Sequence, residues 1–142
     1  MARAYYPRVT TLTAIGLSVV LLVAAWVGWQ ALPPDIQEMF SGVQLATLVL
    51  FVLVMLGIML GIGLSHVRAD EAGLLIRNGL RTHRIEWQQI EGFRFTAHDP
   101  WAYVLFADDP GSRPLMAVQR VDGARARRFV DELTAQWAAR RP

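Results

Sequence analysis

Three histidines and a few acidic residues are the side chains that could carry acid–base chemistry or hold a metal ion. His66, His83 and His98 lie far apart in the sequence, and none belongs to a spacing typical of metal ligands. The one adjacent acid–base pair is His98-Asp99, but "HDP" is also an ordinary turn sequence, and we interpret it as a turn. The chain has no cysteine, which excludes disulfides, thiolate metal sites and cysteine nucleophiles.

The remaining acidic residues do not complete a catalytic or metal site either. Asp108 and Asp109 are separated from Asp99 by an expected strand at 102–107, which places them about 20 Å away along that strand. The sequence contains no glycine-rich phosphate loop and no nucleophile elbow. We therefore expect that the protein is not an enzyme and that it has no cofactor and no metal site.

Positive charge is supplied by arginine alone. All 14 basic residues are Arg, and 12 acidic residues reduce the formal charge to +2, so the balance by itself names no partner. A group near the C-terminus falls on an expected helix, where we interpret it as a solvated face and helix end, and we expect no nucleic acid partner. These residues are Arg125, Arg127, Arg128, Arg140 and Arg141.

Two long apolar runs dominate the first half of the chain. The runs Val9–Trp29 and Val43–Leu64 would form helices of about 31 Å and 33 Å, each enough to cross a bilayer. A signal peptide is the alternative for the first run, but its apolar part is too long, and Trp26 stands where small residues should mark cleavage. We expect a transmembrane hairpin in residues 1–64, with helices at about 9–29 and 43–64.

Charge around these runs predicts their orientation. The loop between them carries Asp35 and Glu38 and no basic residue, whereas arginines flank the outer ends of both runs. By the positive-inside rule, we expect a multi-pass protein of the cell (plasma) membrane, with both termini cytoplasmic and the Pro33-Pro34 loop outside. The flanking arginines are Arg3, Arg8, Arg68, Arg77, Arg81 and Arg84. The expected interfacial aromatic residues are Tyr5, Tyr6, Trp26, Trp29 and Phe40.

The second run contains closely spaced glycines. Gly57, Gly61 and Gly63 have the small-xxx-small spacing that lets helix backbones approach each other. They indicate a helix–helix contact, within the hairpin or with a partner. The alternative is that glycine is simply common in membrane helices.

After Leu64 the pattern changes to short strands with turn residues between them. We expect strands at 65–69, 73–77, 80–86, 90–96, 102–107 and 114–118. Asn78-Gly79 between two of these runs predicts a hairpin with a type I′ turn. Residues 65–142 would then form one domain, an antiparallel barrel or sandwich. Together with a helix at the C-terminus, this domain would belong to the α+β class.

A helix is expected at the C-terminus, over residues 122–140. Asp122 would cap it, and apolar residues from Ala126 to Trp137 recur with helical spacing. We expect Phe129, Leu133 and Trp137 to plug an open end of the sheet structure.

The soluble part also resembles a known family. The stretch "VRADEAGLLIRNGLRTHRIEWQQIEGFRF", with "WAYVLFADD" and "VDGARARRFVDEL" after it, is similar to bacterial pleckstrin-homology (PH-like) domains, in particular the group named for the low-molecular-weight protein antigen six of actinobacteria. The resemblance implies a seven-stranded PH fold closed by a C-terminal helix, often tethered by two membrane helices, with no enzymatic activity. Six strands are identifiable, so we expect a seventh around Gln119–Val121. Trp87 is expected to be a structural plug.

Many eukaryotic PH domains grip inositol phosphates with a basic loop between their first two strands. The equivalent loop here is taken to be Asp70-Glu71-Ala72, which is acidic and would repel a polyphosphate. We therefore do not expect inositol-phosphate binding.

These features predict a membrane-anchored interaction or assembly module whose partner is another membrane or envelope protein. The alternative is a domain that senses anionic lipid surfaces. In that case the basic end of the domain would face the bilayer, and its contacts would come from Arg68, Arg77, Arg81 and Arg120.

Overall fold

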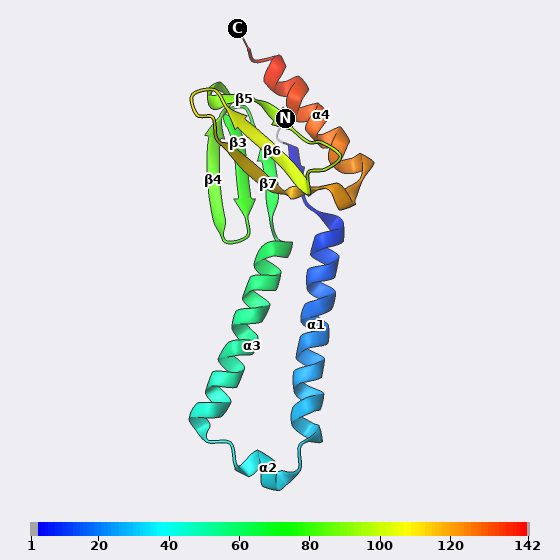
Figure 1. Cartoon of the computed structure of the whole chain (residues 1–142), viewed down its shortest axis with the longest axis vertical. Coiled ribbons are helices and arrows are strands. Elements are labelled where there is room, and N and C mark those ends of the chain that lie inside the picture. The colour runs from blue at the N-terminus through cyan, green and yellow to red at the C-terminus, as the bar shows by residue number, and fades with distance from the viewer. Residues whose placement is uncertain (1–2, 142) are drawn as a thin grey trace.

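Two long helices form a hairpin that carries a domain of strands and one further helix at its open end (Figure 1). The computed structural model describes residues 3–141. Helix α1 spans Arg8–Ala31 and α3 spans Gly42–Gly63, with the short helix α2, Pro34–Glu38, between them. Both long helices could span a membrane by length and composition, and nearly all of their side chains are exposed in the isolated chain.

Local sequence explains where these helices begin and end. Pro33 and Pro34 follow the end of α1, and Pro34 occupies the first turn of α2, where its missing N–H costs nothing. Helix α3 begins with a capping box. In it, the Gln44 N–H donates to Ser41 Oγ at 3.3 Å and the Ser41 N–H donates to Gln44 Oε1 at 2.9 Å.

Seven strands form two antiparallel sheets in chain order. The first sheet contains β1 (Arg3–Tyr5), β2 (His66–Ala69), β3 (Gly73–Asn78) and β4 (Arg81–Glu86). The second contains β5 (Ile90–Arg94), β6 (Trp101–Phe106) and β7 (Ser112–Gln119). Each of the six strands expected from the sequence is present, with ends within two residues of the expected positions.

The seventh strand is β1, which precedes the helical hairpin. Arg3 is paired with Ala69 and Tyr5 with Val67 in antiparallel register. The expectation of a strand around Gln119–Val121 was wrong, because Arg120–Asp122 form the 3-10 helix η2. The first strand of the sheet is thus separated from the second by the entire hairpin, and residues 3–5 belong to the sheet.

The sequence allowed either a barrel or a sandwich. The described strands do not close into a barrel. The 3-10 helix η1, Trp87–Gln89, follows β4, and the chain enters the second sheet without pairing β4 to β5. The sheets instead meet where β7 packs against β2 and β3. Side chains that are fully buried between them include Val67, Leu74, Ile76, Val104, Leu115 and Val118.

Helix α4, Ala124–Ala138, covers the core (Figure 1). It begins two residues later than expected, and the proposed cap was wrong. Gly123, with φ +58°, occupies the cap position without a side-chain bond, and Asp122 bonds elsewhere. The apolar face is as expected: Leu133 is fully buried, Phe129 and Val130 are nearly so, and Trp137 packs against the core.

The β3–β4 turn lies one residue later than the sequence indicated. Asn78 is paired with Arg81, so the turn residues are Gly79 and Leu80. Gly79 has φ +62°, and no residue other than glycine has positive φ among those described, which excludes type I′ and fits type II′. Asn78 stays in the strand because its side chain donates to Pro114 O at 2.7 Å and accepts from the Met116 N–H at 3.1 Å.

The pairing of β1 predicts that the domain depends on residues before the hairpin. A shortened chain, in which Asn-Gly replaces residues 8–64 between Pro7 and Ser65, would close β1–β2 as an ordinary two-residue hairpin. We expect this chain to fold in water. Tyr5→Ala in it should lower the free energy of unfolding by about 3–5 kcal/mol, as truncation of a buried aromatic does.

Urea unfolding followed by circular dichroism measures this effect. Arg127→Ala, an exposed change on α4, is the matched control and should cost less than about 0.5 kcal/mol. Equal stability of the Tyr5→Ala and Arg127→Ala chains would show that β1 contributes nothing to the core.

Candidate functional site

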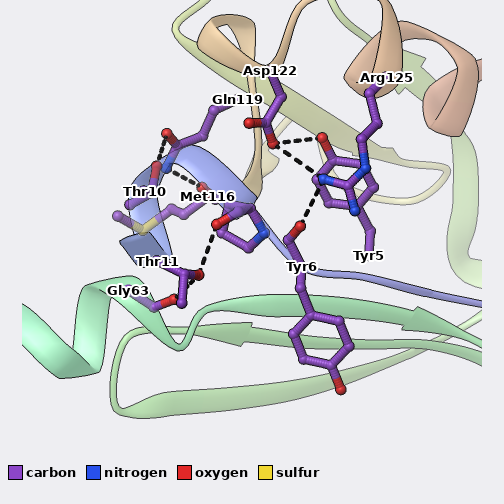
Figure 2. A network of polar contacts seen from close by, with 10 residues as sticks. Tyr5, Tyr6, Thr10, Thr11, Gly63, Met116, Gln119, Asp122 and Arg125 are labelled. Atoms are coloured by element: carbon purple, nitrogen blue, oxygen red, sulfur yellow. Dashed lines mark hydrogen bonds and ion pairs between the residues drawn. The ribbon is translucent and has the colours of Figure 1, made fainter. Parts of the chain in front are cut away.

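The junction between the helical hairpin and the domain contains a connected set of polar contacts (Figure 2). Thr11 in α1 lies with Oγ1 2.6 Å from the carbonyl oxygen of Gly63, at the end of α3, and 2.7 Å from that of Pro7. Its single hydroxyl proton can be donated to either oxygen. Thr11 therefore joins the start of one helix to the end of the other.

The two helices touch closely at this level. A Cβ added to Gly63 would lie 2.6 Å from Ala14 Cβ, a distance that real side chains do not adopt. Gly63 is therefore the glycine that permits the close approach. Gly61 instead faces Leu80 of the β3–β4 turn, and Gly57 has open space around it in the described chain. A contact of Gly57 or Gly61 with a partner helix stays a prediction.

A second contact joins α1 to β7. Thr10 Oγ1 donates to Gln119 Oε1 at 2.5 Å, and Gln119 Nε2 donates to Met116 O at 2.9 Å (Figure 2). Gln119 is thereby held in an orientation that offers its oxygen to the helix. The sequence did not indicate this contact, because two uncharged polar residues so far apart carry no local signal.

Tyr5, Asp122 and Arg125 form the third part of the junction. The Tyr5 hydroxyl donates to Asp122 Oδ2 at 2.6 Å, and the Arg125 guanidinium lies over the Tyr5 ring at 4.3 Å. Arg125 also donates to the Tyr6 carbonyl oxygen at 2.8 Å. The interfacial position expected for Tyr5 was wrong: this ring is 3% exposed and packs on Phe129 at 4.8 Å.

Burial sets the protonation state of this group. Burial first, and then the hydrogen bond and negative charge of Asp122, raise the pKa of Tyr5 well above its usual value. The phenol is therefore a neutral donor at physiological pH. The Asp122 carboxylate, whose side chain is 3% exposed, lies near Arg125 at 3.7 Å and has a positive neighbour for its charge.

The turn between β3 and β4 is also fixed at this end of the domain. The Gly79 N–H donates to the buried Ser65 Oγ at 2.9 Å, and Arg77 Nε donates to Gly79 O at 3.1 Å. Arg77 and Arg81 flank this turn next to the end of α3. Arg120 lies in η2 and donates to Ala97 O at 2.8 Å. Arg68 is exposed on β2, two residues further from α3 than His66.

The four residues expected to act as a plug lie together only in part. Phe129 and Leu133 are buried under α4, and the Trp137 indole N–H donates to Ile90 O at 2.8 Å. Trp87 is 7% exposed, and its indole N–H donates to Asp70 O at 2.9 Å. The Arg140 guanidinium lies 5.0 Å from the centre of the Trp87 ring.

The acidic residues singled out from the sequence hold turns together. Desolvation would raise the pKa of Asp70. The N–H groups of Ala72 and Gly73 and the nearby Arg84 guanidinium outweigh it and lower that pKa below its usual value. Thr96 holds the pKa of Asp99 below its usual value by donating to it from both N–H and hydroxyl. Over residues 3–141, no three His, Asp or Glu side chains gather where a metal could bind.

Comparison with known proteins identifies the strand-rich part. A family model described as a bacterial PH domain matches residues 65–135, which is 71 of the 142 residues. The chain belongs to the bacterial PH domain family. The resemblance noted in the sequence is therefore confirmed. The match begins at Ser65, so β1 and the hairpin lie outside it.

The curated relatives of this bacterial PH domain protein are mycobacterial. Uncharacterized proteins of Mycobacterium tuberculosis and Mycobacterium bovis are 34% identical to it over 90 residues, which is 63% of this chain and 58% of theirs. The chain thus spans less than two thirds of the length of these relatives. No solved structure matches the chain significantly.

Gly63 and Gly57 give a matched test of the junction. Gly63→Ala should lower the free energy of unfolding of the full chain by about 1–3 kcal/mol, because the added methyl overlaps Ala14. Gly57→Ala meets no atom and should be neutral, or stabilising by up to about 1 kcal/mol, since alanine is the better helix former. Thermal unfolding in detergent measures both, and equal melting temperatures would contradict the close contact at Gly63.

Proposed function

We propose that this chain is a membrane-anchored, non-catalytic adaptor. Its PH-like domain is displayed at the cytoplasmic face of the cell membrane and binds another membrane or envelope protein. The observation that carries the proposal is the junction. Thr11 joins the two long helices to each other at Gly63, and the Thr10–Gln119 bond and the β1–β2 pairing fasten them to one end of the domain. Such fastening presents the rest of the domain surface in a constant orientation.

Edge strands support an interaction role. Among the described strands, β4 is hydrogen-bonded only to β3, so its other edge carries backbone groups that a strand of another protein could pair with. The family match supports a PH-like module, and the family resemblance implies no catalytic activity.

Charge and strand pairing support the proposed orientation in the membrane. Since β1 and β2 are neighbours in one sheet, the start of α1 and the end of α3 must lie on the same side of a bilayer that both helices cross. The acidic α1–α3 loop and the flanking arginines favour the cytoplasmic side for the domain. Both termini are cytoplasmic in this proposal.

A cysteine scan tests this topology. The chain has no native cysteine, so Ile36→Cys in the α1–α3 loop and Ser112→Cys in β7 each provide one label site. We expect an impermeant maleimide to modify position 36 in intact cells and position 112 only after permeabilisation. The reverse pattern would place the domain outside.

Cross-linking of the full chain in native membranes tests the adaptor role. We expect one stoichiometric protein partner, recovered with the full chain and lost from a chain that ends at Leu64, because the domain supplies the binding surface. The truncated chain keeps the hairpin and therefore controls for contacts made by the helices. Recovery of the same partner with the truncated chain would assign binding to the hairpin.

A lipid-sensing role is the second candidate, favoured by Arg77, Arg81 and Arg120 at the helix-bearing end of the domain. Each arginine near an anionic surface contributes about 1 kcal/mol. Under this alternative, the shortened chain with Pro7 joined to Ser65 binds anionic liposomes in a salt-dependent manner. Arg77→Glu with Arg81→Glu should weaken that binding, whereas Asp108→Asn with Asp109→Asn should not. Equal binding to neutral liposomes would exclude this role.

The loop Asp70-Glu71-Ala72 is not the connection between the first two strands of the sheet. Asp70-Glu71-Ala72 connects β2 to β3, whereas the connection between the first two strands is the helical hairpin itself. We still propose that inositol phosphates are not bound. The hairpin stands between the first two strands, where a phosphate-binding PH domain has its basic loop. Nucleic acid remains outside the proposed partners, since Arg125 and Arg140 make contacts within the chain.

A further inference from the structure

Two large apolar side chains stand exposed on the domain. In the described residues 65–141, Leu80 is 81% exposed and Val121 is 61% exposed, and every other large apolar side chain there is buried or half-buried. Isolated exposed apolar residues are common on soluble proteins and by themselves indicate nothing. Their positions are what matter, because both lie at the end of the domain from which the helices leave.

Leu80 lies beside the last turn of α3. A Cβ added to Gly61 would be 3.4 Å from Leu80 Cδ2, and Gly61 is about 3 Å along the axis from the end of the helix at Gly63. The turn is held there by the bond from the Gly79 N–H to Ser65 Oγ. If α3 crosses a bilayer of about 30 Å of hydrocarbon, its last turn marks the boundary between acyl chains and headgroups. Leu80 is at that depth.

Val121 lies beside the start of α1. It is the central residue of η2, and Gln119, two residues before it, accepts the hydrogen bond from Thr10 of α1. The segment between β7 and α4, drawn in orange, lies next to the first turns of α1 (Figure 1). Val121 is therefore placed near the level at which α1 enters the bilayer, as Leu80 is for α3.

Cationic side chains accompany both apolar residues. Arg77 and Arg81 flank the turn that carries Leu80, and Arg120 precedes Val121. Apolar side chains next to arginines are the pattern of surfaces that rest on anionic membranes, where the first enter the acyl boundary and the second meet phosphate groups.

We propose that the domain is seated on the lipid surface, with Leu80 and Val121 inserted at the acyl–headgroup boundary beside α3 and α1. This inference rests on the proposed membrane anchoring and adds a second attachment to it. The bilayer is the occupant because each side chain lies beside a different membrane helix at the same level, where lipid surrounds both helices. Seated in this way, the domain cannot tilt freely, and the β6–β7 loop at Asp108 faces away from the membrane.

Spin labels measure the depth of these side chains. Leu80→Cys and Val121→Cys, each in the full cysteine-free chain, are labelled with a nitroxide and placed in nanodiscs of phosphatidylcholine and phosphatidylglycerol. Power saturation compares collisions with oxygen, which concentrates in lipid, against collisions with a water-soluble nickel complex. We expect both labels to be more accessible to oxygen and less accessible to nickel than a label at Asp108→Cys. Val20→Cys, near the middle of α1, provides the lipid reference.

The label at position 20 distinguishes failure of the seated-domain proposal from failure of the proposed membrane anchoring. A lipid-exposed label at position 20 with water-exposed labels at both 80 and 121 overturns the seated domain and leaves the anchoring intact. A water-exposed label at position 20 overturns the anchoring and the seated domain together. If only one of positions 80 and 121 lies in lipid, the proposal that both side chains are inserted is wrong. Lipid exposure at position 108 equal to that at position 80 also overturns it, since the far end of the domain would then touch the membrane.

Discussion

The pairing of β1 with β2 is the constraint on which the rest of the architecture depends. These strands lie on either side of the helical hairpin in the sequence, yet Tyr5 is opposite Val67 and Arg3 is opposite Ala69. The hairpin must therefore return to the place where it started, within the spacing of neighbouring strands, about 4.8 Å. Two antiparallel helices of similar length satisfy this requirement, and a single long helix could not.

Side-chain contacts convert that return into a rigid junction. Thr11 bonds Gly63 between the helices, Thr10 bonds Gln119 between helix and sheet, and Tyr5 reaches Asp122 ahead of α4. These contacts involve both long helices, β7 and the segment before α4, so a rotation of the domain about either helix would break several of them together. The Tyr5–Asp122 bond is shielded from competing water because Tyr5 and the Asp122 side chain are almost fully buried, and the low local dielectric strengthens it.

The same constraint means that the first sheet of this bacterial PH domain protein extends beyond the residues that the family model matches. The family match starts at Ser65, whereas the first sheet contains four strands only when residues 3–5 are counted. The connection that links the first two strands is made of some sixty residues and includes both long helices. The domain is therefore joined to the hairpin at two neighbouring strands of one sheet, and these two connections limit how far it can tilt relative to the hairpin.

Much of the local structure was determined by the sequence alone. Short strand-like runs between turn residues located β2 to β7, uninterrupted apolar length located α1 and α3, and helical spacing located the buried face of α4, since each signal needs only neighbouring residues. Tertiary structure decided the features that depend on residues far apart. Three residues, Arg3–Tyr5, are too few to show a period, and they form a strand only because β2 offers an open edge. Asn78 belongs to β3 and not to the turn, because its side chain is bonded to Pro114 and Met116. Leu80 therefore lies in the turn, where it is exposed. Asp122 accepts the Tyr5 hydrogen bond and does not cap α4, because a buried phenol needs an acceptor. Gly123 occupies the cap position of α4 without a side-chain hydrogen bond.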